Sequence, residues 1–352
     1  MSTVHVVVPD GIDDPARPSG GNVYDRRLCD ALASLGVTVR EHAVNGSWPR
    51  ADAASFAALA DVLQQLSDDA VVLIDGLIAS TAPDVLLPQA RRLHLVVLVH
   101  MPLGHRPDDD AARTRERAVL SDAAAIVTTS AWARRRLIEL YALPADRIHV
   151  AEPGVDAAEL APGAGDGGAL LCVAAVVFDK GHDVLLDALA SISALSWRCV
   201  CVGSLEREPA FVERLRRRAG DLGLGDRVSF PGPQTGTELD RSYAGAGVLV
   251  LASRAETYGM VVTEALARGL PVIAAEVGGL PEALGHGADR TRPGMLVRPD
   301  DAAALGASLR KWLDDAELRG RLRRAARERR ASLPGWPATA SAVAAVLTGV
   351  SR

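Results

Sequence analysis

Short apolar segments alternate with longer helical patterns along this chain, and the alternation constrains the fold more than any other feature. Strands of a parallel sheet are buried on both faces, and a helix usually connects each strand to the next. The pattern therefore predicts a doubly wound α/β domain with right-handed crossovers. The strands of a first series are expected at residues 3–8, 37–42, 70–74, 93–99, 125–129 and 147–151.

The alternation stops at residues 156–168, where Pro, Gly and Ala dominate, and then starts again. Such composition is typical of a linker. Because 352 residues suffice for two cores, we predict a first domain over 1–155, a second over 169–333 and a last helical segment over 334–352. The second series of strands is expected at 169–174, 198–202, 228–230, 248–251, 271–275 and 295–297.

Composition excludes several classes of function. The net charge is −5, and residues 1–160 carry 15 arginines against 22 acidic residues, or −7, so nucleic acid is not an expected partner. No apolar run approaches the about 18 residues of a membrane span, and the chain starts as a strand without a leader, so we expect a cytoplasmic protein. The cysteines form no CxxC pair and are interpreted as core residues of a reduced protein: Cys29, Cys172, Cys199 and Cys201.

The stretch over 252–284 indicates an anion site. A buried strand ends, the loop SRAETYG follows, and Gly259 opens a short helix that closes at Gly269. A helix N-terminus offers free amide N–H groups and the positive end of the helix dipole. We therefore expect the amides of Gly259, Met260 and Val261 to face an anionic ligand.

Two of the carboxylates in this stretch are candidates for the site. Glu256 lies in the loop, and Glu264 lies in a helix that is apolar nearly all round, where a charge is costly unless hydrogen-bond donors meet it. Spacing alone leaves two interpretations open. Either both glutamates bind a ligand, or Glu264 pairs with Arg268 one turn on and Glu256 is a solvated loop charge.

Lys180 stands in a Lys-Gly turn between a buried strand and an amphipathic helix. Only two of the 39 basic residues are lysines, Lys180 and Lys311, so arginine has replaced lysine almost everywhere else. A compact ammonium beside a helix N-terminus suits a phosphate group. The alternative is an exposed turn charge.

Glycines mark two further strand ends. Gly20 and Gly21 end the loop after the first strand and precede a helix, which lets a ligand approach closely; the alternative is a turn that needs glycine only for its bend. The pattern is not the GxGxxG dinucleotide motif. Gly203 closes another strand and is a candidate for the edge of a nucleotide base.

His100 lies at the carboxyl end of a buried strand, the edge at which open α/β sheets bind ligands. A lone histidine there is otherwise a satisfied structural residue. The acidic run Asp108–Asp109–Asp110 contains a DxD pattern of the kind that binds a divalent metal ion. We interpret it as negative charge at a helix start and predict no metal.

These motifs together resemble those of the retaining glycosyltransferase family 4, also called group 1, which has the GT-B fold. Glu256 and Glu264 match its paired glutamates in ETYGMVVTE, Lys180 matches its Lys-Gly turn, and GGLPEAL at 278–284 matches the segment after the next strand. The resemblance is strongest over residues 170–300.

One position departs from the family pattern. An arginine usually stands five residues before the lysine, and here that residue is Ala175, so half of the usual diphosphate clamp is missing. We expect another cation to take part of this role, and Arg254 is the nearest in sequence to the site. Tyr258 in the same loop is a further candidate donor-binding residue.

The resemblance implies two domains that face each other across a cleft, with the last segment crossing back to the first domain. It implies transfer of a hexose from a nucleotide diphosphate sugar, such as a UDP- or GDP-sugar, to an acceptor hydroxyl with retention and without a separate cofactor. Glu264 is expected to bind the ribose diol, Glu256 and His100 the donor sugar, Lys180 the diphosphate, and the Gly20-Gly21 loop the sugar phosphate and acceptor.

Two alternatives stay open, a nucleotide-sugar epimerase of the same fold and a nucleotide-sugar-binding protein without turnover. The missing arginine at Ala175 keeps the second in view. We expect a small soluble acceptor and no stable membrane association, because the helix predicted over 52–69 carries no Lys or Arg to attract anionic lipid. The sequence does not indicate the nucleotide, the sugar or the oligomeric state.

Overall fold

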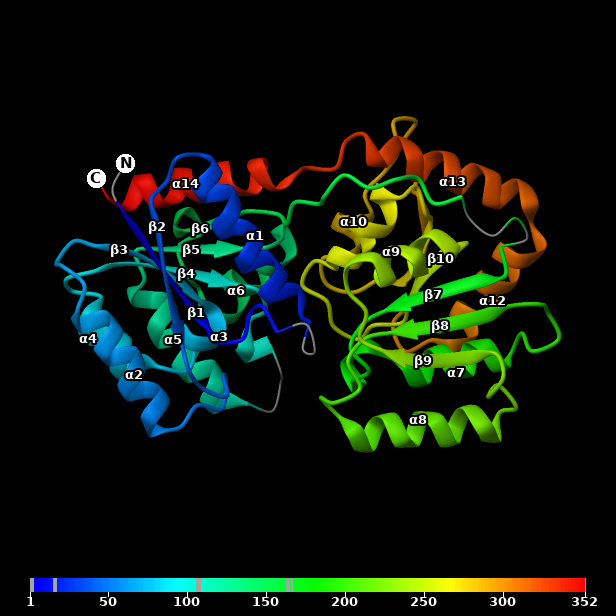
Figure 1. Ribbon diagram of the computed structural model, residues 1–352, viewed down its shortest axis with the longest axis horizontal. Helices are drawn as coiled ribbons and strands as arrows, with labels where there is room; N and C mark the ends of the chain where they lie inside the picture. Colours follow the sequence, from blue (N-terminus) through cyan, green and yellow to red (C-terminus); the bar gives the residue numbers. More distant parts are fainter. Residues whose placement is uncertain (1–2, 15–17, 106–108, 163–164, 166, 352) are drawn as a thin grey trace. The chain divides into compact units, whose positions relative to one another are not determined.

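The computed structural model describes residues 3–14, 18–105, 109–162, 165 and 167–351, which form two compact units (Figure 1). The first unit contains residues up to Asp14, Gly20–Gly154 and the C-terminal segment from Pro334, and the second contains Val155–Leu333. Each unit has a six-stranded parallel sheet with helices packed on it. The predicted class of two doubly wound domains is confirmed.

The first unit has the strand order β2-β1-β3-β4-β5-β6. Its strands are β1 (Val4–Pro9), β2 (Val39–Val44), β3 (Val71–Asp75), β4 (His94–Val99), β5 (Ala125–Thr128) and β6 (Ile148–Val150). Its helices are α1 (Gly20–Ser34), α2 (Ala53–Gln64), α3 (Gly76–Ala79), α4 (Pro83–Gln89), α5 (Asp110–Asp122), α6 (Ala131–Tyr141) and α14 (Trp336–Val350), with short 3-10 turns η1 (Leu103–His105) and η2 (Ala145–Arg147).

The second unit has the strand order β12-β11-β10-β7-β8-β9. Its strands are β7 (Ala169–Val173), β8 (Arg198–Val202), β9 (Val228–Gly232), β10 (Val248–Leu251), β11 (Val272–Ala275) and β12 (Gly294–Val297). Its helices are α7 (His182–Ala190), α8 (Pro209–Asp221), α9 (Gly236–Gly245), α10 (Met260–Ala267), α11 (Leu280–Leu284), α12 (Ala302–Asp314) and α13 (Ala316–Arg330), with the 3-10 turn η3 (Phe178–Lys180).

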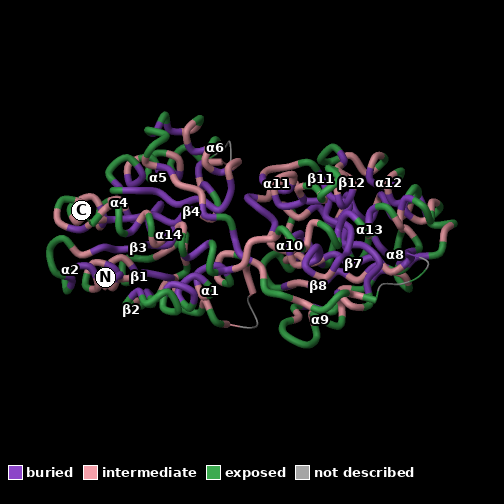
Figure 2. Tube along the Cα trace, turned by 90° about the horizontal axis from the view of Figure 1, so that it is seen from above, coloured by how far each residue is buried: buried purple, intermediate pink, exposed green. Residues whose placement is uncertain are grey.

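All of the predicted strands are present, and their ends differ from the prediction by at most two residues. The reason is burial on both faces: every residue of β3 and of β10 is buried, so β-branched and leucine side chains fill consecutive positions. Figure 2 shows the buried residues gathered along the strands of both sheets. Among the described residues, no helix has the length and apolarity needed to cross a bilayer.

The C-terminal helix α14 belongs to the first unit, where it packs against α1. The ring of Trp336 meets Tyr24 edge-on at 5.6 Å between centroids, and Thr339 donates to the carbonyl of Glu152 at 2.8 Å. Gly154 is needed at this junction, because a Cβ there would lie 2.3 Å from the backbone nitrogen of Trp336. These contacts bring the last residues of the chain onto the first sheet.

The segment predicted as a linker is attached to the second unit. The amide of Ala161 donates to the carbonyl of Arg268 at 2.9 Å, and Arg330 donates to the carbonyl of Ala158 at 2.6 Å. Backbone groups of the segment are therefore held by α10 and α13 rather than left to solvent. Residues 163, 164 and 166 of this segment lie outside the described residues.

The acidic run before α5 acts at the helix start, as its position indicated. The carboxylate of Asp109 is the N-cap and accepts from the amide of Ala112 at 2.8 Å, and Asp110 lies in the first turn. Both carboxylates meet the positive end of the helix dipole. Asp108 lies outside the described residues.

Candidate functional site

Lys180 and Glu256 form an ion pair at the carboxyl edge of the second sheet. The Lys180 Nζ donates to Glu256 Oε1 at 2.6 Å, although 76 residues separate them in sequence. The close approach depends on Gly181, which has a φ of 65° and whose Cβ would lie 1.9 Å from the carbonyl oxygen of Ala252. Only glycine lets the Lys-Gly turn lie against the end of β10.

The Glu256 carboxylate is mostly shielded, so the interpretation as a solvated loop charge is wrong. Its side chain is 12% exposed, and that of Lys180 is 21% exposed. The Oγ of Ser253 donates to the same Oε1 at 3.2 Å. Among the described residues Oε2 has no hydrogen-bond partner, which leaves one carboxylate oxygen able to accept a hydrogen bond from a ligand hydroxyl.

Two glycines that sequence reasoning did not assign hold the Glu256 loop in place. A Cβ on Gly278 would lie 1.6 Å from the carbonyl oxygen of Glu256, and one on Gly279 would lie 2.1 Å from that of Thr257. The amide of Gly279 also donates to the Glu256 carbonyl at 3.1 Å. The signal was present in GGLPEAL, because paired glycines indicate close backbone approach.

The N-terminus of α10 follows this loop directly. Gly259 has a φ of 91°, and its Cβ would lie 2.4 Å from a methyl carbon of Leu280, so the position requires glycine. Met260 and Val261, the first two helical residues, are only half-buried. The ring of Tyr258 lies in the apolar core and is 3% exposed, so only its backbone is placed to meet a ligand.

Glu264 projects from α10 and is held by a tyrosine. The hydroxyl of Tyr243, which is fully buried on α9, donates to Glu264 Oε2 at 2.8 Å. Burial raises the pKa of Glu264 above its ordinary value, while the Tyr243 hydrogen bond and the charge of Arg268 oppose that rise. Arg268 donates to the backbone carbonyl of Glu264 at 2.9 Å and to the Asp240 carboxylate. The alternative prediction, an ion pair between the side chains of Glu264 and Arg268, is therefore wrong.

Arg254 is occupied by structural ion pairs. Its guanidinium binds both carboxylate oxygens of Asp183 at 2.9 Å and Oδ1 of Asp300 at 2.6 Å, and it lies 4.1 Å from the ring centroid of Phe178. Hydrogen bonding to Asp183 raises its pKa above the ordinary value, against a smaller effect of burial. A cation neutralised by two carboxylates is a poor replacement for the arginine missing at Ala175, so this geometry counts against that expectation.

Gly203 fulfils a packing requirement at the end of β8. It has a φ of 154°, and a Cβ there would lie 1.9 Å from the carbonyl oxygen of Ala174. The residue therefore lets β8 lie close to the segment that leads from β7 to Lys180. It stands at the carboxyl edge of the sheet, as predicted for the border of a base site.

In the first unit, His100 lies between two buried carboxylates. Its Nε2 is 2.7 Å from Oδ1 of Asp25 on α1 and 3.5 Å from Oδ2 of Asp75 at the end of β3. Burial alone would lower the pKa of His100, but the charge and hydrogen bond of Asp25, with the charge of Asp75, outweigh it and raise the pKa to about 9. Burial and the charge of Asp25 raise the pKa of Asp75 to about 7.

Gly21 lies beside this imidazole. A Cβ on Gly21 would be 3.3 Å from Cδ2 of His100, closer than side chains usually approach. Gly20 is the first residue of α1, two residues earlier than the predicted start at Asn22. The structure therefore places Gly21 beside His100, a contact that the sequence analysis did not predict.

Sequence reasoning missed both carboxylates around His100. Asp75 ends a buried strand, and the rule that selected His100, a polar residue at the carboxyl end of a strand, also selects it. Asp25 lies inside a helix and is 75 residues from its partner, so no local pattern marks it.

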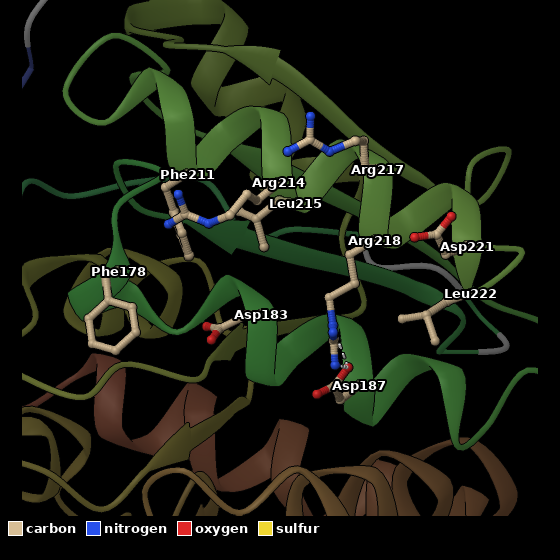
Figure 3. A pocket seen from close by; sticks show the side chains of 10 residues that line it. All are labelled: Phe178, Asp183, Asp187, Phe211, Arg214, Leu215, Arg217, Arg218, Asp221 and Leu222. Atoms are coloured by element: carbon tan, nitrogen blue, oxygen red, sulfur yellow. Dashed lines mark hydrogen bonds and ion pairs between the residues drawn. The ribbon is translucent and has the colours of Figure 1, made fainter.

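A shallow hollow of about 530 Å³ lies between α7 and α8 (Figure 3). The ion pair of Arg218 with Asp187 crosses it, and Phe178 stands at one end. It is lined by neither Lys180, Glu256 nor Glu264. We therefore place the candidate site at the sheet edge and not in this hollow.

Comparison with known families matches both units. Residues 3–159 match the family described as Glycosyltransferase Family 4, and residues 163–329 match the family described as Glycosyl transferases group 1. The two matches between them cover most of the chain, including all of the candidate residues described above.

Curated relatives carry glycosyltransferase names. The D-inositol 3-phosphate glycosyltransferase of Frankia alni is 33% identical over 265 residues, which cover 69% of this chain and 63% of that protein. The D-inositol 3-phosphate glycosyltransferase 1 of Catenulispora acidiphila is 32% identical over 274 residues, covering 71% and 64%. The match thus spans less than two thirds of the length of these two relatives.

Solved structures share the fold. Sucrose-phosphate synthase from Thermosynechococcus elongatus has a TM-score of 0.80 at 22% identity, with 99% of each chain covered. The Anabaena protein HepE in complex with UDP and glucose has a TM-score of 0.78 at 18% identity, with 98% of this chain and 99% of that chain covered. These likenesses and the two parallel sheets show the GT-B fold, and the two family matches show that the chain belongs to the group 1, family 4 glycosyltransferases.

Proposed function

We propose that the protein transfers a hexosyl group from a nucleotide diphosphate sugar to a hydroxyl of a small soluble acceptor, with retention at the anomeric carbon. The observation that carries the proposal is the Lys180–Glu256 ion pair beside the N-terminus of α10. A cation, a carboxylate with a free oxygen and a helix N-terminus are the groups needed to hold a sugar diphosphate at one sheet edge.

Lys180 and the amides at the start of α10 would neutralise the leaving group. When the bond between the anomeric carbon and the phosphate oxygen breaks, its electron pair moves onto the diphosphate. Preorganised donors that meet this developing charge are worth more in the transition state than in the ground state. Diphosphate binding would divert Lys180 from Glu256, which frees that carboxylate for the hydroxyls of the donor sugar.

Glu264 would accept hydrogen bonds from the ribose diol. Tyr243 already donates to Oε2, which fixes the carboxylate and leaves Oε1 for the nucleoside. Hydrogen bonds from the ligand would stabilise the ionised form of the Glu264 carboxylate. Because burial raises the pKa of Glu264, we expect the ligand to bind better above that pKa than below it.

His100 would serve as a charged donor toward the sugar. With a pKa of about 9 its imidazole is protonated at neutral pH, so both ring nitrogens are donors. One of them is engaged by Asp25, and the other can donate to a substrate hydroxyl or phosphate. A protonated imidazole cannot act as a general base, so in this proposal the departing phosphate oxygen takes the acceptor proton while the new bond forms on the same face of the sugar.

The relatives guide the choice of acceptor. Two proteins that match this chain are named for glycosyl transfer to D-inositol 3-phosphate, and we propose a polyhydroxylated small molecule, with phosphorylated cyclitols and sugars the first to screen. An epimerase would release the epimerised sugar nucleotide without an acceptor, and a binding protein would leave the donor intact.

Donor profiling by thermal shift tests the proposal. We expect one of the UDP-, GDP- or ADP-sugars to raise the unfolding temperature, because a ligand at about 100 times its Kd adds about 2.7 kcal/mol of stability. The magnesium salts of the same nucleotides, with and without chelator, serve as the control for metal dependence. Failure of every nucleotide sugar to stabilise the protein would refute the donor assignment.

A further inference from the structure

Three of the four cysteines in the chain converge inside the second unit. Cys172 on β7 and Cys201 on β8 are register partners in neighbouring parallel strands, and Cys199 precedes Cys201 by two positions, so all three side chains share one face of the sheet. His182, the first residue of α7, covers that face. Each of the four side chains is 1% exposed.

The distances among these atoms suit the ligands of one metal ion. The Cys172 Sγ lies 3.7 Å from the His182 Nε2, and the Cys172, His182 and Cys201 ligand atoms all lie within 4.8 Å of one another. A tetrahedral zinc ion with bonds of about 2.3 Å to sulfur and about 2.0 Å to nitrogen separates its ligand atoms by about 3.5–3.8 Å. The Cys199 Sγ, 4.0 Å from the Cys201 Sγ, is the nearest candidate for a fourth position.

His182 is the residue that a purely apolar core does not explain. Its Nδ1 is buried without a hydrogen-bond partner among the described residues, and its Nε2 faces only the weakly polar Cys172 sulfur. A buried imidazole without strong partners is costly, and an apolar residue would fill the same space without that cost. A metal ion on Nε2 replaces that weak contact by a strong bond, while Nδ1 keeps its place without a partner among the described residues.

We propose that Cys172, Cys201 and His182 bind a thiophilic metal ion, with Zn²⁺ the expected occupant and Cys199, which would have to move closer, the candidate for the fourth position. Thiolate and imidazole ligands together select Zn²⁺ or Cu⁺ over Mg²⁺ and Ca²⁺. The site is structural, because its three ligands and the neighbouring Cys199 are buried and no position is open to substrate. It joins β7, β8 and α7 directly beside the Lys180-Gly181 turn, so the ion stabilises the platform that carries Lys180.

Cobalt titration of the reduced full-length protein tests the site. Tetrahedral Co²⁺ bound to thiolates gives intense visible and near-ultraviolet absorption, and Zn²⁺ displaces it. We expect saturation at one Co²⁺ per chain, loss of at least tenfold in affinity for Cys172→Ala, Cys201→Ala and His182→Asn, and a smaller loss for Cys199→Ala. Cys29→Ala, which changes the one cysteine in the other unit, should bind as the wild type does.

Cobalt titration of the wild-type protein tests the metal site even if a variant does not fold. A folded, reduced wild-type chain that shows no stoichiometric thiolate–cobalt absorption overturns the proposal, and the cysteines are then core residues only. Equal binding by Cys172→Ala and the wild type, with matching circular dichroism, also overturns it. Neither outcome bears on the nucleotide-sugar assignment, which the thermal-shift profile tests independently.

Discussion

The hydrogen bond between Asp25 and His100 predicts a stability that depends on pH. The pKa of His100 is about 9 in the folded protein and 6.5 for a free histidine. Each unit of difference is worth about 1.4 kcal/mol, so protonation of His100 contributes about 3 kcal/mol. Because the folded value is the higher one, the folded state binds the extra proton, and the contribution is complete below pH about 6.5 and lost as the pH rises through about 9.

We therefore expect Asp25→Asn to lower the free energy of unfolding by about 3 kcal/mol at pH about 6, and by much less above pH about 9. Urea unfolding of both proteins across this range measures the difference, and relief of Asp75, whose pKa the charge of Asp25 raises to about 7, makes the loss smaller still above that pH. Asp30→Asn, an exposed carboxylate on the same helix, is the matched control and should show no such trend. A difference that stays constant with pH would refute a protonated His100.

Three further outcomes follow from the site. Glu256→Gln should lower kcat about 100-fold with little change in the Kd of the free nucleotide diphosphate, and Glu264→Ala should raise that Kd about tenfold or more, as calorimetry can measure; equal losses of affinity would contradict both roles. Gly278→Ala should destabilise the fold by about 1–3 kcal/mol, because its Cβ would meet the Glu256 carbonyl, whereas Gly220→Ala, on helix α8 with open space around it, should leave the unfolding temperature unchanged or raise it slightly. Co-sedimentation with anionic liposomes at low salt should show no binding, since α2 has no basic residue, and salt-sensitive binding would overturn the soluble-acceptor proposal.

The sheets could be predicted because burial on both faces leaves a strong local signal. The run VVLID of β3 is apolar at consecutive positions and ends in a polar residue at the edge of the sheet. The same logic located Lys180 and Glu256 at the carboxyl edge of the second sheet and His100 at that of the first, since the carboxyl ends of the parallel strands of one sheet meet at one edge. The ends of the strands could therefore be predicted from the sequence, and so could the candidate residues that follow them.

Contacts that depend on register or on helix packing could not be predicted. The cysteines are dispersed in sequence. Cys172 lies opposite Cys201 because of the register between β7 and β8, and the sequence of the segment that connects two parallel strands does not indicate their register. Asp25 meets His100 across 75 residues of sequence, and Arg254 is held by Asp183 and Asp300 from two separate segments. In each case the partner is set by tertiary packing, and the local sequence is compatible with an ordinary core or surface residue.

We propose above all that Lys180 binds the diphosphate of the donor. Lys311, the only other lysine in the sequence, is exposed on α12 and serves as the control. The decisive measurement is kcat for sugar transfer from the donor found by thermal shift, in Lys180→Ala and Lys311→Ala. Loss of one preorganised donor to the leaving group should lower kcat by about 100-fold or more in Lys180→Ala, and Lys311→Ala should match the wild type. A Lys180→Ala enzyme that keeps wild-type kcat would contradict the account.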